Sequence, residues 1–305
     1  MPNATHVPWF EGFEAQHFRV GGQDIFARTG GRKEGPPVLL LHGFPQTHVM
    51  WHRVARTLAE RCFVVVPDLR GYGDSSKPAG EADHANYSKR ALALDMALLM
   101  SQLGRARFAL VGHDRGGRVA HRLALDHSQR VSSLCVIDIA PTLDMYEATS
   151  MQFASAYYHW FHLIQPAPLP ERMIGADPKF YLHWTLGGWG ASGLGHIEPA
   201  ALADYERCFC RPEAIHAACE DYRAAAGIDL EHDRASRAVG QKLACDTLVL
   251  WAGRGVVQRL FKPLELWQAQ CSARVTGEAL PGGHFLPEEL PDATAAAIAA
   301  HLQAT

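Results

Sequence analysis

The sequence predicts a doubly wound α/β fold, in which helices cover both faces of a mostly parallel β-sheet. Stretches with apolar residues at helical spacing alternate with short, almost continuously apolar runs. Such runs are typical of parallel strands that are buried on both faces, and their alternation with helices is the pattern of this fold. The strand-like runs occupy residues 38–43, 62–68, 108–114, 133–139 and 246–253, and the clearest helical stretches occupy residues 87–104 and 117–130.

A long segment interrupts the alternation. Residues 143–241 contain no strand-like run and are rich in aromatic residues and histidine, and the strand pattern resumes at Asp246. We interpret this helical insertion as a cap over an active site, although most of its aromatic side chains need only pack the cap onto the core. The expected organisation is a core domain of residues 1–142 and 242–305, with a helical cap of residues 143–241. A chain of 305 residues is long enough for this arrangement.

The composition is that of a soluble globular protein, with 48% hydrophobic and 20% charged residues. A formal net charge of −3 gives no reason to expect nucleic acid or a membrane surface as a partner. No apolar run approaches the roughly 18 residues that span a bilayer, and residues 1–18 show no secretory signal. The seven cysteines are odd in number and scattered, which favours reduced thiols in the cytoplasm.

The motif Gly112-His113-Asp114-Arg115-Gly116 lies between a strand-like run and a helix. A glycine-flanked nucleophile in this context predicts a sharp turn that lifts the nucleophile to the top of the sheet. The turn also directs backbone N–H groups at a developing oxyanion. The alternative is an aspartate that only caps the helix, but the residues described next complete a site around it.

The nucleophile of this motif is aspartate rather than serine. A carboxylate is suited to attack an sp³ carbon that carries a leaving group, which gives an alkyl ester on the enzyme. Water then hydrolyses this ester by attacking the carbonyl carbon of Asp114. The sequence therefore predicts a displacement reaction with two chemical steps.

A base and an acid are needed as partners. His284 lies in a glycine-rich loop near the C-terminus, and the chain order nucleophile, acid, histidine predicts that it is the base. The segment that follows residues 246–253 holds no carboxylate. We therefore expect Asp138, at the end of the run 133–139, to orient His284. Asp144, within the expected cap, is the weaker alternative.

Two arginines follow the nucleophile. Arg115 and Arg118 are three residues apart and share a helix face, so both guanidinium groups can lie beside Asp114. A guanidinium fork matches a carboxylate in bidentate fashion, which predicts that they bind a substrate carboxylate. The alternative is that they pair with acids of the cap. The oxyanion is expected to meet the backbone N–H groups of Arg115 and of Phe44, which lies in the loop after the first strand-like run.

A departing halide needs hydrogen-bond donors in a dry pocket. Tyrosine O–H, tryptophan N–H and histidine N–H groups can serve. The expected cap offers His159 and Trp160 side by side and Tyr222 further along.

These motifs resemble those of the fluoroacetate dehalogenases of the α/β-hydrolase superfamily, over nearly the whole chain. The matching segments are His42-Gly43-Phe44-Pro45, Asp68-Leu69-Arg70-Gly71-Tyr72-Gly73, Gly112-His113-Asp114-Arg115-Gly116-Gly117-Arg118, Asp138-Ile139-Ala140-Pro141-Thr142, Tyr158-His159-Trp160, Gln165-Pro166-Ala167-Pro168, Asp221-Tyr222-Arg223 and Gly282-Gly283-His284.

The resemblance implies an α/β-hydrolase fold, a mostly parallel doubly wound sheet with an inserted helical cap. It implies that Asp114, Asp138 and His284 form the catalytic triad and that Arg115 and Arg118 bind substrate carboxylate. It further implies that halide is held by His159, Trp160 and Tyr222, with Trp189 as a further pocket wall. The implied reaction converts a 2-haloacid such as fluoroacetate, with water, into a 2-hydroxy acid such as glycolate. It also implies a homodimer that needs no metal and no organic cofactor.

Two other functions are compatible with the same fold. An epoxide hydrolase uses the same triad but is expected to carry an aromatic residue after the nucleophile, often tryptophan, and a pair of cap tyrosines. Arg115 argues against that alternative. A ligand-binding receptor on this fold would bind a small molecule without repeated turnover, and the complete set of nucleophile, acid and base argues against it.

Overall fold

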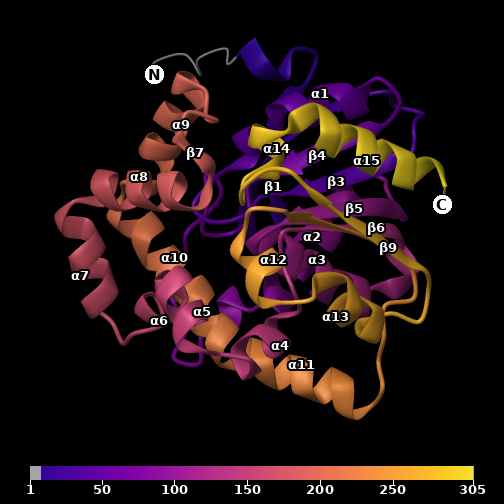
Figure 1. Cartoon of the computed structure of the whole chain (residues 1–305). Coiled ribbons are helices and arrows are strands. Elements are labelled where there is room, and N and C mark those ends of the chain that lie inside the picture. The colour runs from indigo at the N-terminus through magenta and orange to yellow at the C-terminus, as the bar shows by residue number, and fades with distance from the viewer. Residues whose placement is uncertain (1–7, 305) are drawn as a thin grey trace.

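The computed structural model of the chain describes residues 8–304. Its centre is an eight-stranded sheet in the order β1-β2-β4-β3-β5-β6-β8-β9 (Figure 1). Strands β1, β2 and β4 pair antiparallel, and all the other pairs are parallel. The strands are β1 (Glu14–Val20), β2 (Gln23–Gly31), β3 (Pro37–Leu41), β4 (Phe63–Pro67), β5 (Phe108–His113), β6 (Val131–Ile137), β8 (Asp246–Ala252) and β9 (Val275–Leu280). The five predicted strands thus form the parallel centre, as expected.

Strands β1, β2 and β9 were not predicted. In β1, four of the first five residues are exposed, so buried and exposed side chains hardly alternate there. In β9, only Leu280 is buried. Edge strands of this kind need no continuous apolar run, because solvent covers part of their surface.

Helices cover both faces of the sheet, which confirms the doubly wound fold. Figure 1 shows α1 and α15 on one face and α2 and α3 on the other. The core helices are α1 (His52–Ala59), α2 (Lys89–Gln102), α3 (Arg115–Asp126), α12 (Val256–Leu260), α13 (Pro263–Gln270), α14 (Leu286–Glu289) and α15 (Pro291–Gln303). Short 3₁₀ turns occur at η1 (Pro8–Phe10), η2 (His48–Trp51), η3 (Ala85–Tyr87) and η4 (Ser128–Arg130).

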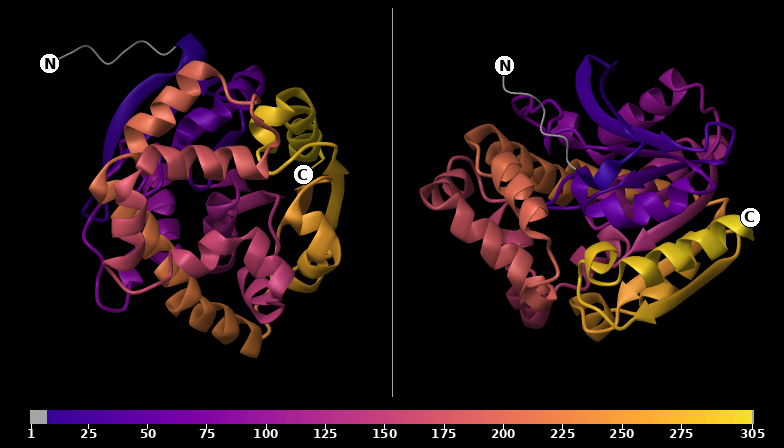
Figure 2. Two further views of the ribbon diagram at one scale, coloured as in Figure 1. Left: turned by 60° about the vertical axis from the view of Figure 1, so that its left-hand side comes forward. Right: turned by 90° about the horizontal axis from the view of Figure 1, so that it is seen from above.

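Between β6 and β8 the chain leaves the sheet and forms a helical layer at one side of it (Figure 2). This layer contains α4 (Thr142–Glu147), α5 (Met151–Ala156), α6 (Tyr158–His162), α7 (Leu169–Ala176), α8 (Pro178–Trp189), α9 (Pro199–Phe209), α10 (Pro212–Ala226) and α11 (Ile228–Ala238). The expectation that it holds no strand was wrong for β7 (Ala191–Leu194), which lies outside the eight-stranded sheet. The sequence ASGL has no apolar run that could have indicated this strand.

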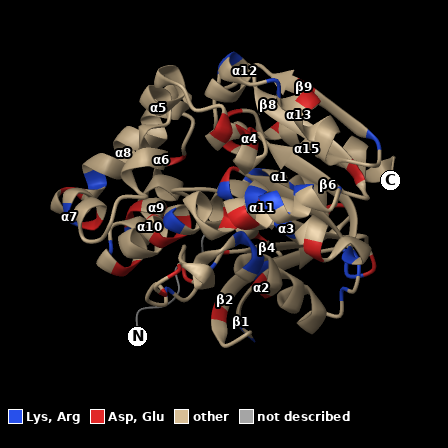
Figure 3. Ribbon diagram, turned by 90° about the horizontal axis from the view of Figure 1, so that it is seen from below, with Lys and Arg blue, Asp and Glu red and all other residues tan. Residues whose placement is uncertain are grey.

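The core is formed by the central strands and the helices against them. Residues 38–41 of β3 are completely buried. Acidic residues lie on α4 and charged residues of both signs on α11 (Figure 3), and Arg237 of α11 pairs with Asp144 of α4. Within the described part of the chain, no helix combines the length and the apolar character needed to cross a membrane. We expected no secretory signal in residues 1–18, and residues 1–7 of that segment lie outside the described residues.

Candidate active site

Asp114 stands in a sharp turn between β5 and α3. Its φ of 46° and ψ of −116° lie in a region that side-chain-bearing residues rarely adopt. Neighbouring glycines permit this geometry. A Cβ on Gly43 would lie 2.5 Å from Cβ of Asp114, and a Cβ on Gly116 would lie 2.4 Å from the carbonyl oxygen of Leu41. The structure thus has the strained strand–turn–helix that the glycine motif predicts.

The loop after β3 contacts the carboxylate of Asp114 directly. The backbone N–H of Phe44 donates a hydrogen bond of 2.9 Å to Oδ1 of Asp114. Within residues 8–304, no group donates a hydrogen bond to Oδ2. Burial by itself raises the pKa of Asp114, but the electrostatic interactions with His284, His113 and the two arginines outweigh it and lower the pKa. The geometry therefore leaves an ionised carboxylate with one oxygen held and one free.

Asp138 and His284 form a buried pair. Nδ1 of His284 donates to Oδ2 of Asp138 at 2.6 Å. Oδ1 of Asp138 accepts from the backbone N–H of Ala252 at 2.9 Å, so both carboxylate oxygens are occupied. Burial lowers the pKa of His284, but the hydrogen bond and charge of Asp138 outweigh this and leave the pKa raised. Asp144, the weaker alternative, lies elsewhere and pairs with Arg237.

The loop that carries His284 is fixed at two further points. Nε2 of His113, which precedes Asp114, donates to the carbonyl oxygen of His284 at 2.8 Å. The backbone N–H of His284 donates to the carbonyl oxygen of Trp189 at 3.0 Å. The loop of His284 is therefore tied both to the turn at Asp114 and to the end of α8. The sequence did not indicate this role of His113, since the glycine-flanked nucleophile motif allows any residue directly before the nucleophile.

The two predicted arginines are buried, and each has most of its donors occupied. Arg115 donates from Nε to Oδ2 of Asp221 at 2.7 Å and from Nη2 to the Asp221 carbonyl oxygen at 2.8 Å. Arg118 donates from Nη1 to Thr142 Oγ1 at 2.9 Å and to the Ala140 carbonyl oxygen at 3.2 Å. Of the guanidinium nitrogens of these two arginines, only Nη1 of Arg115 and Nε of Arg118 are buried without a hydrogen-bond partner.

This arrangement changes the expected mode of carboxylate binding. Asp221 is an acid of the helical layer, so the alternative that an arginine pairs with such an acid applies to Arg115. The bidentate fork expected from each guanidinium is not available. Each arginine instead has one free nitrogen, which is enough for one oxygen of a carboxylate.

The three predicted halide donors lie together beside Asp114. The rings of His159 and Tyr222 are 5.5 Å apart, and Phe44 contacts both. The guanidinium of Arg118 lies 4.6 Å from the ring centre of Trp160, and that of Arg115 lies 4.1 Å from that of Tyr222. Nδ1 of His159, Nε1 of Trp160 and Oη of Tyr222 are all buried without a hydrogen-bond partner. Burial lowers the pKa of His159 well below 6.5, so its imidazole is neutral.

Two more aromatic residues surround this cluster. Trp189 lies 4.2 Å from the ring of His159 and 5.8 Å from the ring of His284, consistent with the expected pocket wall. Tyr157 is buried and its ring lies 6.4 Å from that of His284. Burial raises its pKa, and the negative charges of Asp138 and Asp114 raise it further. In the sequence, Tyr157 is one of many aromatic residues of the segment 143–241, and no pattern distinguishes it from the others.

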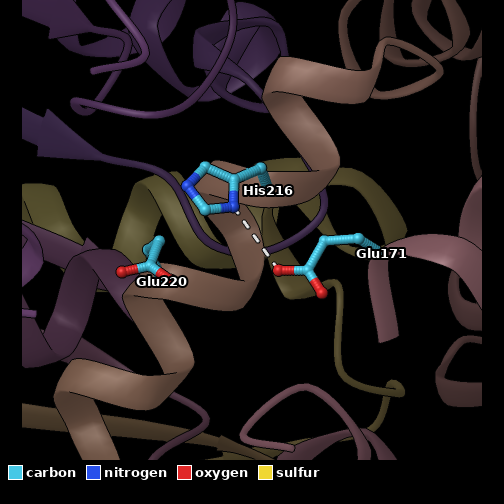
Figure 4. Close-up of side chains that lie close together, drawn as sticks. All are labelled: Glu171, His216 and Glu220. Carbon is cyan, nitrogen blue, oxygen red and sulfur yellow. Dashed lines mark hydrogen bonds and ion pairs between the residues drawn. The ribbon is translucent and has the colours of Figure 1, made fainter. Parts of the chain in front are cut away.

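A second group of polar side chains is a candidate for metal binding. Glu171 of α7 and His216 and Glu220 of α10 point toward one another (Figure 4), with one ligand atom of each within 4.8 Å of the others. However, Arg223 donates to Glu171 at 2.7 Å and to Glu220 at 2.6 Å. His84 also contacts Glu220, at 2.7 Å. The two carboxylates therefore already have positively charged or polar partners, and the geometry does not call for an ion.

Comparison with known proteins defines the class. A family model described as the alpha/beta hydrolase fold matches residues 36–289. The chain therefore belongs to the α/β-hydrolase family, as the parallel sheet and the turn at Asp114 also indicate.

Individual relatives are more specific. The chain is 49% identical to a fluoroacetate dehalogenase from Burkholderia sp over 286 residues, which cover 94% of this chain and 92% of that protein. This confirms the resemblance that the motifs predicted. The chain is also 32% identical to a soluble epoxide hydrolase from Corynebacterium sp., over 89% of this chain and 91% of that protein. A crystal structure from Nostoc sp PCC 7120, named as an α/β hydrolase, has a TM-score of 0.92 at 52% identity and covers 95% of this chain and 97% of that one.

Proposed function

We propose that this protein is a haloacetate dehalogenase that hydrolyses the carbon–halide bond of fluoroacetate and related small 2-haloacids. One observation carries the proposal. Five buried polar atoms without partners surround an ionised aspartate, and they fall into two sets. Two guanidinium nitrogens suit a carboxylate, and three neutral donors suit a halide. They are Nη1 of Arg115, Nε of Arg118, Nδ1 of His159, Nε1 of Trp160 and Oη of Tyr222.

In the first step, Oδ2 of Asp114 attacks the α-carbon in line while the carbon–halide bond breaks and the halide leaves with the bonding electrons. Phe44 already holds Oδ1, which orients the free oxygen for attack. The substrate carboxylate accepts from Arg115 and Arg118. His159, Trp160 and Tyr222 donate to the departing halide, which is the larger requirement when the leaving group is fluoride.

In the second step, water attacks the carbonyl carbon of the Asp114 ester and gives a proton to His284, whose protonated form Asp138 stabilises. The oxyanion forms on Oδ1, the atom that the Phe44 N–H contacts. The N–H of Arg115 is proposed as the second donor. Collapse of the intermediate returns the proton from His284 to the leaving alkoxide and releases glycolate, and the second proton of the water is lost from the Asp114 carboxyl group to solvent, which restores the carboxylate.

Domain organisation and assembly are part of the same proposal. We propose that residues 143–241 are the cap over a core of residues 1–142 and 242–305, and that the seven free cysteines reflect the reducing cytoplasm. The proposed homodimer is supported by four large apolar side chains that α7 and α8 expose to solvent, since such patches mark interaction surfaces. They are Leu169, Met173, Phe180 and Trp184.

An epoxide hydrolase is the second candidate. It is favoured by the 32% identical relative and by Tyr157 and Tyr222, two buried tyrosines whose rings both contact His159 and which could protonate an epoxide oxygen. The two buried arginines argue against it, because a neutral epoxide gives them no partner.

Fluoride release from fluoroacetate, measured with an ion-selective electrode, tests the proposal. Chloride release from chloroacetate and hydrolysis of styrene oxide are measured in parallel. Repeated turnover of fluoride by the wild type, lost in Asp114→Asn and kept in the matched control Asp144→Asn, is the expected result. Chloride without fluoride restricts the activity to weaker bonds. Hydrolysis of the epoxide with no halide release selects the second candidate.

A further inference from the structure

A buried network of charges lies behind Arg115. Asp221 of α10 is fully buried, and its Oδ2 accepts from Nε of Arg115 at 2.7 Å and from the hydroxyl of Tyr72 at 2.8 Å. Its Oδ1 accepts from Nζ of Lys89. Lys89, in α2, also lies 3.4 Å from Oδ2 of Asp229 in α11. The network thus joins α2, α10, α11 and the segment after β4. It lies on the side of Arg115 that faces away from Nη1, the nitrogen without a partner.

Asp221 fixes Arg115 in one orientation. It engages Nε through its carboxylate and Nη2 through its carbonyl oxygen, and these two bonds define the plane of the guanidinium. The face of this plane lies against Tyr222 at 4.1 Å. Nη1 is the remaining nitrogen, and it is buried with no partner. A guanidinium held at two nitrogens loses little further conformational freedom when the third binds a ligand. Ligand binding therefore carries little entropic cost for ordering the Arg115 side chain.

The charges of the network show why Asp221 does not cancel the attraction of Arg115 for an anion. Two cations, Lys89 and Arg115, share the carboxylate of Asp221. Lys89 lies closer to Asp221 than to Asp229. Its positive charge therefore offsets part of the negative charge of Asp221, which would otherwise neutralise Arg115. Arg115 therefore keeps a positive field in a region from which water is excluded, where such a field is strong.

We propose that Asp221 is a positioning residue for carboxylate recognition, which holds Arg115 so that Nη1 alone meets one oxygen of a small carboxylate ligand. This rests on the proposed function for the identity of the ligand. It deepens that function, because it assigns one oxygen to Arg115 and leaves the other to Nε of Arg118. Asp221 touches neither substrate nor the reacting atoms, and it acts through Arg115.

Binding of acetate, a carboxylate without a leaving group, tests the inference without requiring turnover. Calorimetry on the full chain is expected to show that Asp221→Asn weakens acetate binding by about 10- to 100-fold, the effect of one hydrogen bond between charged groups. Asp229→Asn is the matched control, since it removes a buried carboxylate from the same network that does not contact Arg115. Its acetate affinity is expected to stay within about twofold of the wild type, a change well below one such bond.

A double-mutant cycle separates positioning from general stability. In an Arg115→Met background, Asp221→Asn is expected to cause no further loss of acetate binding, whereas a merely structural role predicts the same loss in both backgrounds. If Asp221→Asn does not fold, Tyr72→Phe removes one hydrogen bond from the same carboxylate, and about two- to fivefold weaker acetate binding is expected. The inference is overturned if acetate binding is unchanged in these variants, or if the wild type does not bind acetate.

Halide release by the wild type distinguishes this inference from the proposed function. Asp221-dependent acetate binding without halide release would support carboxylate recognition and overturn the dehalogenase. Halide release with an acetate affinity that is indifferent to Asp221 would support the dehalogenase and overturn the role of Asp221.

Discussion

Replacing Glu288 with glutamine is expected to stabilise the protein, by an amount that grows as the pH rises from about 4.5 to about 8. Glu288, in α14, is 2% exposed. Its carboxyl group meets the hydroxyl of Tyr205 at 2.9 Å and the amide of Gln46, and both are neutral. Arg53 donates to the backbone oxygen of Glu288 and pairs with Glu198 instead of the carboxylate. Burial therefore raises the pKa of Glu288 from 4.5 to about 8.

The magnitude follows from these two pKa values. Between pH 4.5 and 8 the folded protein keeps a proton that the unfolded chain has lost, so the stability of the wild type falls through this window. The fall is about 1.4 kcal/mol for each pH unit, or about 3 kcal/mol at pH 7 as an upper bound. The glutamine variant does not titrate, and a 180° turn of the Gln46 amide lets the new amide donate to Oε1 of Gln46, which is buried and unpartnered.

Thermal unfolding of both proteins at several pH values is the appropriate assay. At roughly 2 °C for each kcal/mol in a domain of this size, the variant is expected to melt about 6 °C above the wild type at pH 7 and within about 1 °C of it at pH 4.5. Glu289→Gln is the control. Its carboxylate accepts from the backbone N–H groups of Gly283 and Phe285, so its replacement is expected to destabilise. A difference for Glu288→Gln that is independent of pH would refute the reasoning, since it would mean that Glu288 is ionised in the folded protein.

Three further outcomes are expected from the proposed mechanism. His284→Gln should stop after one halide per active site and retain a carboxymethyl ester on Asp114, visible by intact-protein mass spectrometry; sustained turnover would rule out His284 as the base. Tyr222→Phe should slow fluoride release by about 10- to 100-fold and bromide release much less, and equal losses would argue against a halide contact. Since the pKa of His284 is raised above 6.5 and that of Asp114 is lowered, acidification should abolish steady-state turnover but spare the first burst of halide. Loss of both together in rapid-quench measurements would contradict these assignments.

The parallel centre of the sheet was predictable because each of its strands is buried on both faces. Residues 63–67 of β4 and 108–112 of β5 are therefore apolar without interruption. The edge strands β1 and β9 were not predictable, since most of their side chains are exposed or only partly buried and only pairing with a neighbour makes them strands. A local pattern carries no information on such pairing.

Within the site, local geometry was more predictable than long-range pairing. The strained turn at Asp114 follows from two glycines close in sequence, and the neighbours of Arg115 do not. Asp221 is 106 residues away from Arg115, and only the tertiary fold brings these two residues together. For this reason the sequence predicted two free guanidinium forks, whereas the structure leaves each arginine a single free nitrogen. Tyr157 was overlooked for the same reason, because its neighbours His284 and Asp138 belong to distant segments.

The position of Asp138 has a consequence for sequence variation. This residue reaches His284 from the end of β6 with a φ of 50°. The strand next to it, β8, contributes only backbone groups, namely the N–H of Ala252 to Oδ1 and the carbonyl oxygen of Leu250 to the N–H of Asp138. To hold Asp138 in place, residue 252 must keep its N–H and so cannot be proline. Gly255 must also stay small, since a Cβ there would lie 2.8 Å from Cβ of Ala252. Asp138 requires nothing else of the side chains that follow β8. No side chain after β8 is thus needed to hold the acid of the triad, so an exposed position such as Arg254 can diverge in sequence while Asp138 keeps its place, whereas Val257 of α12 stays constrained by its burial in the core.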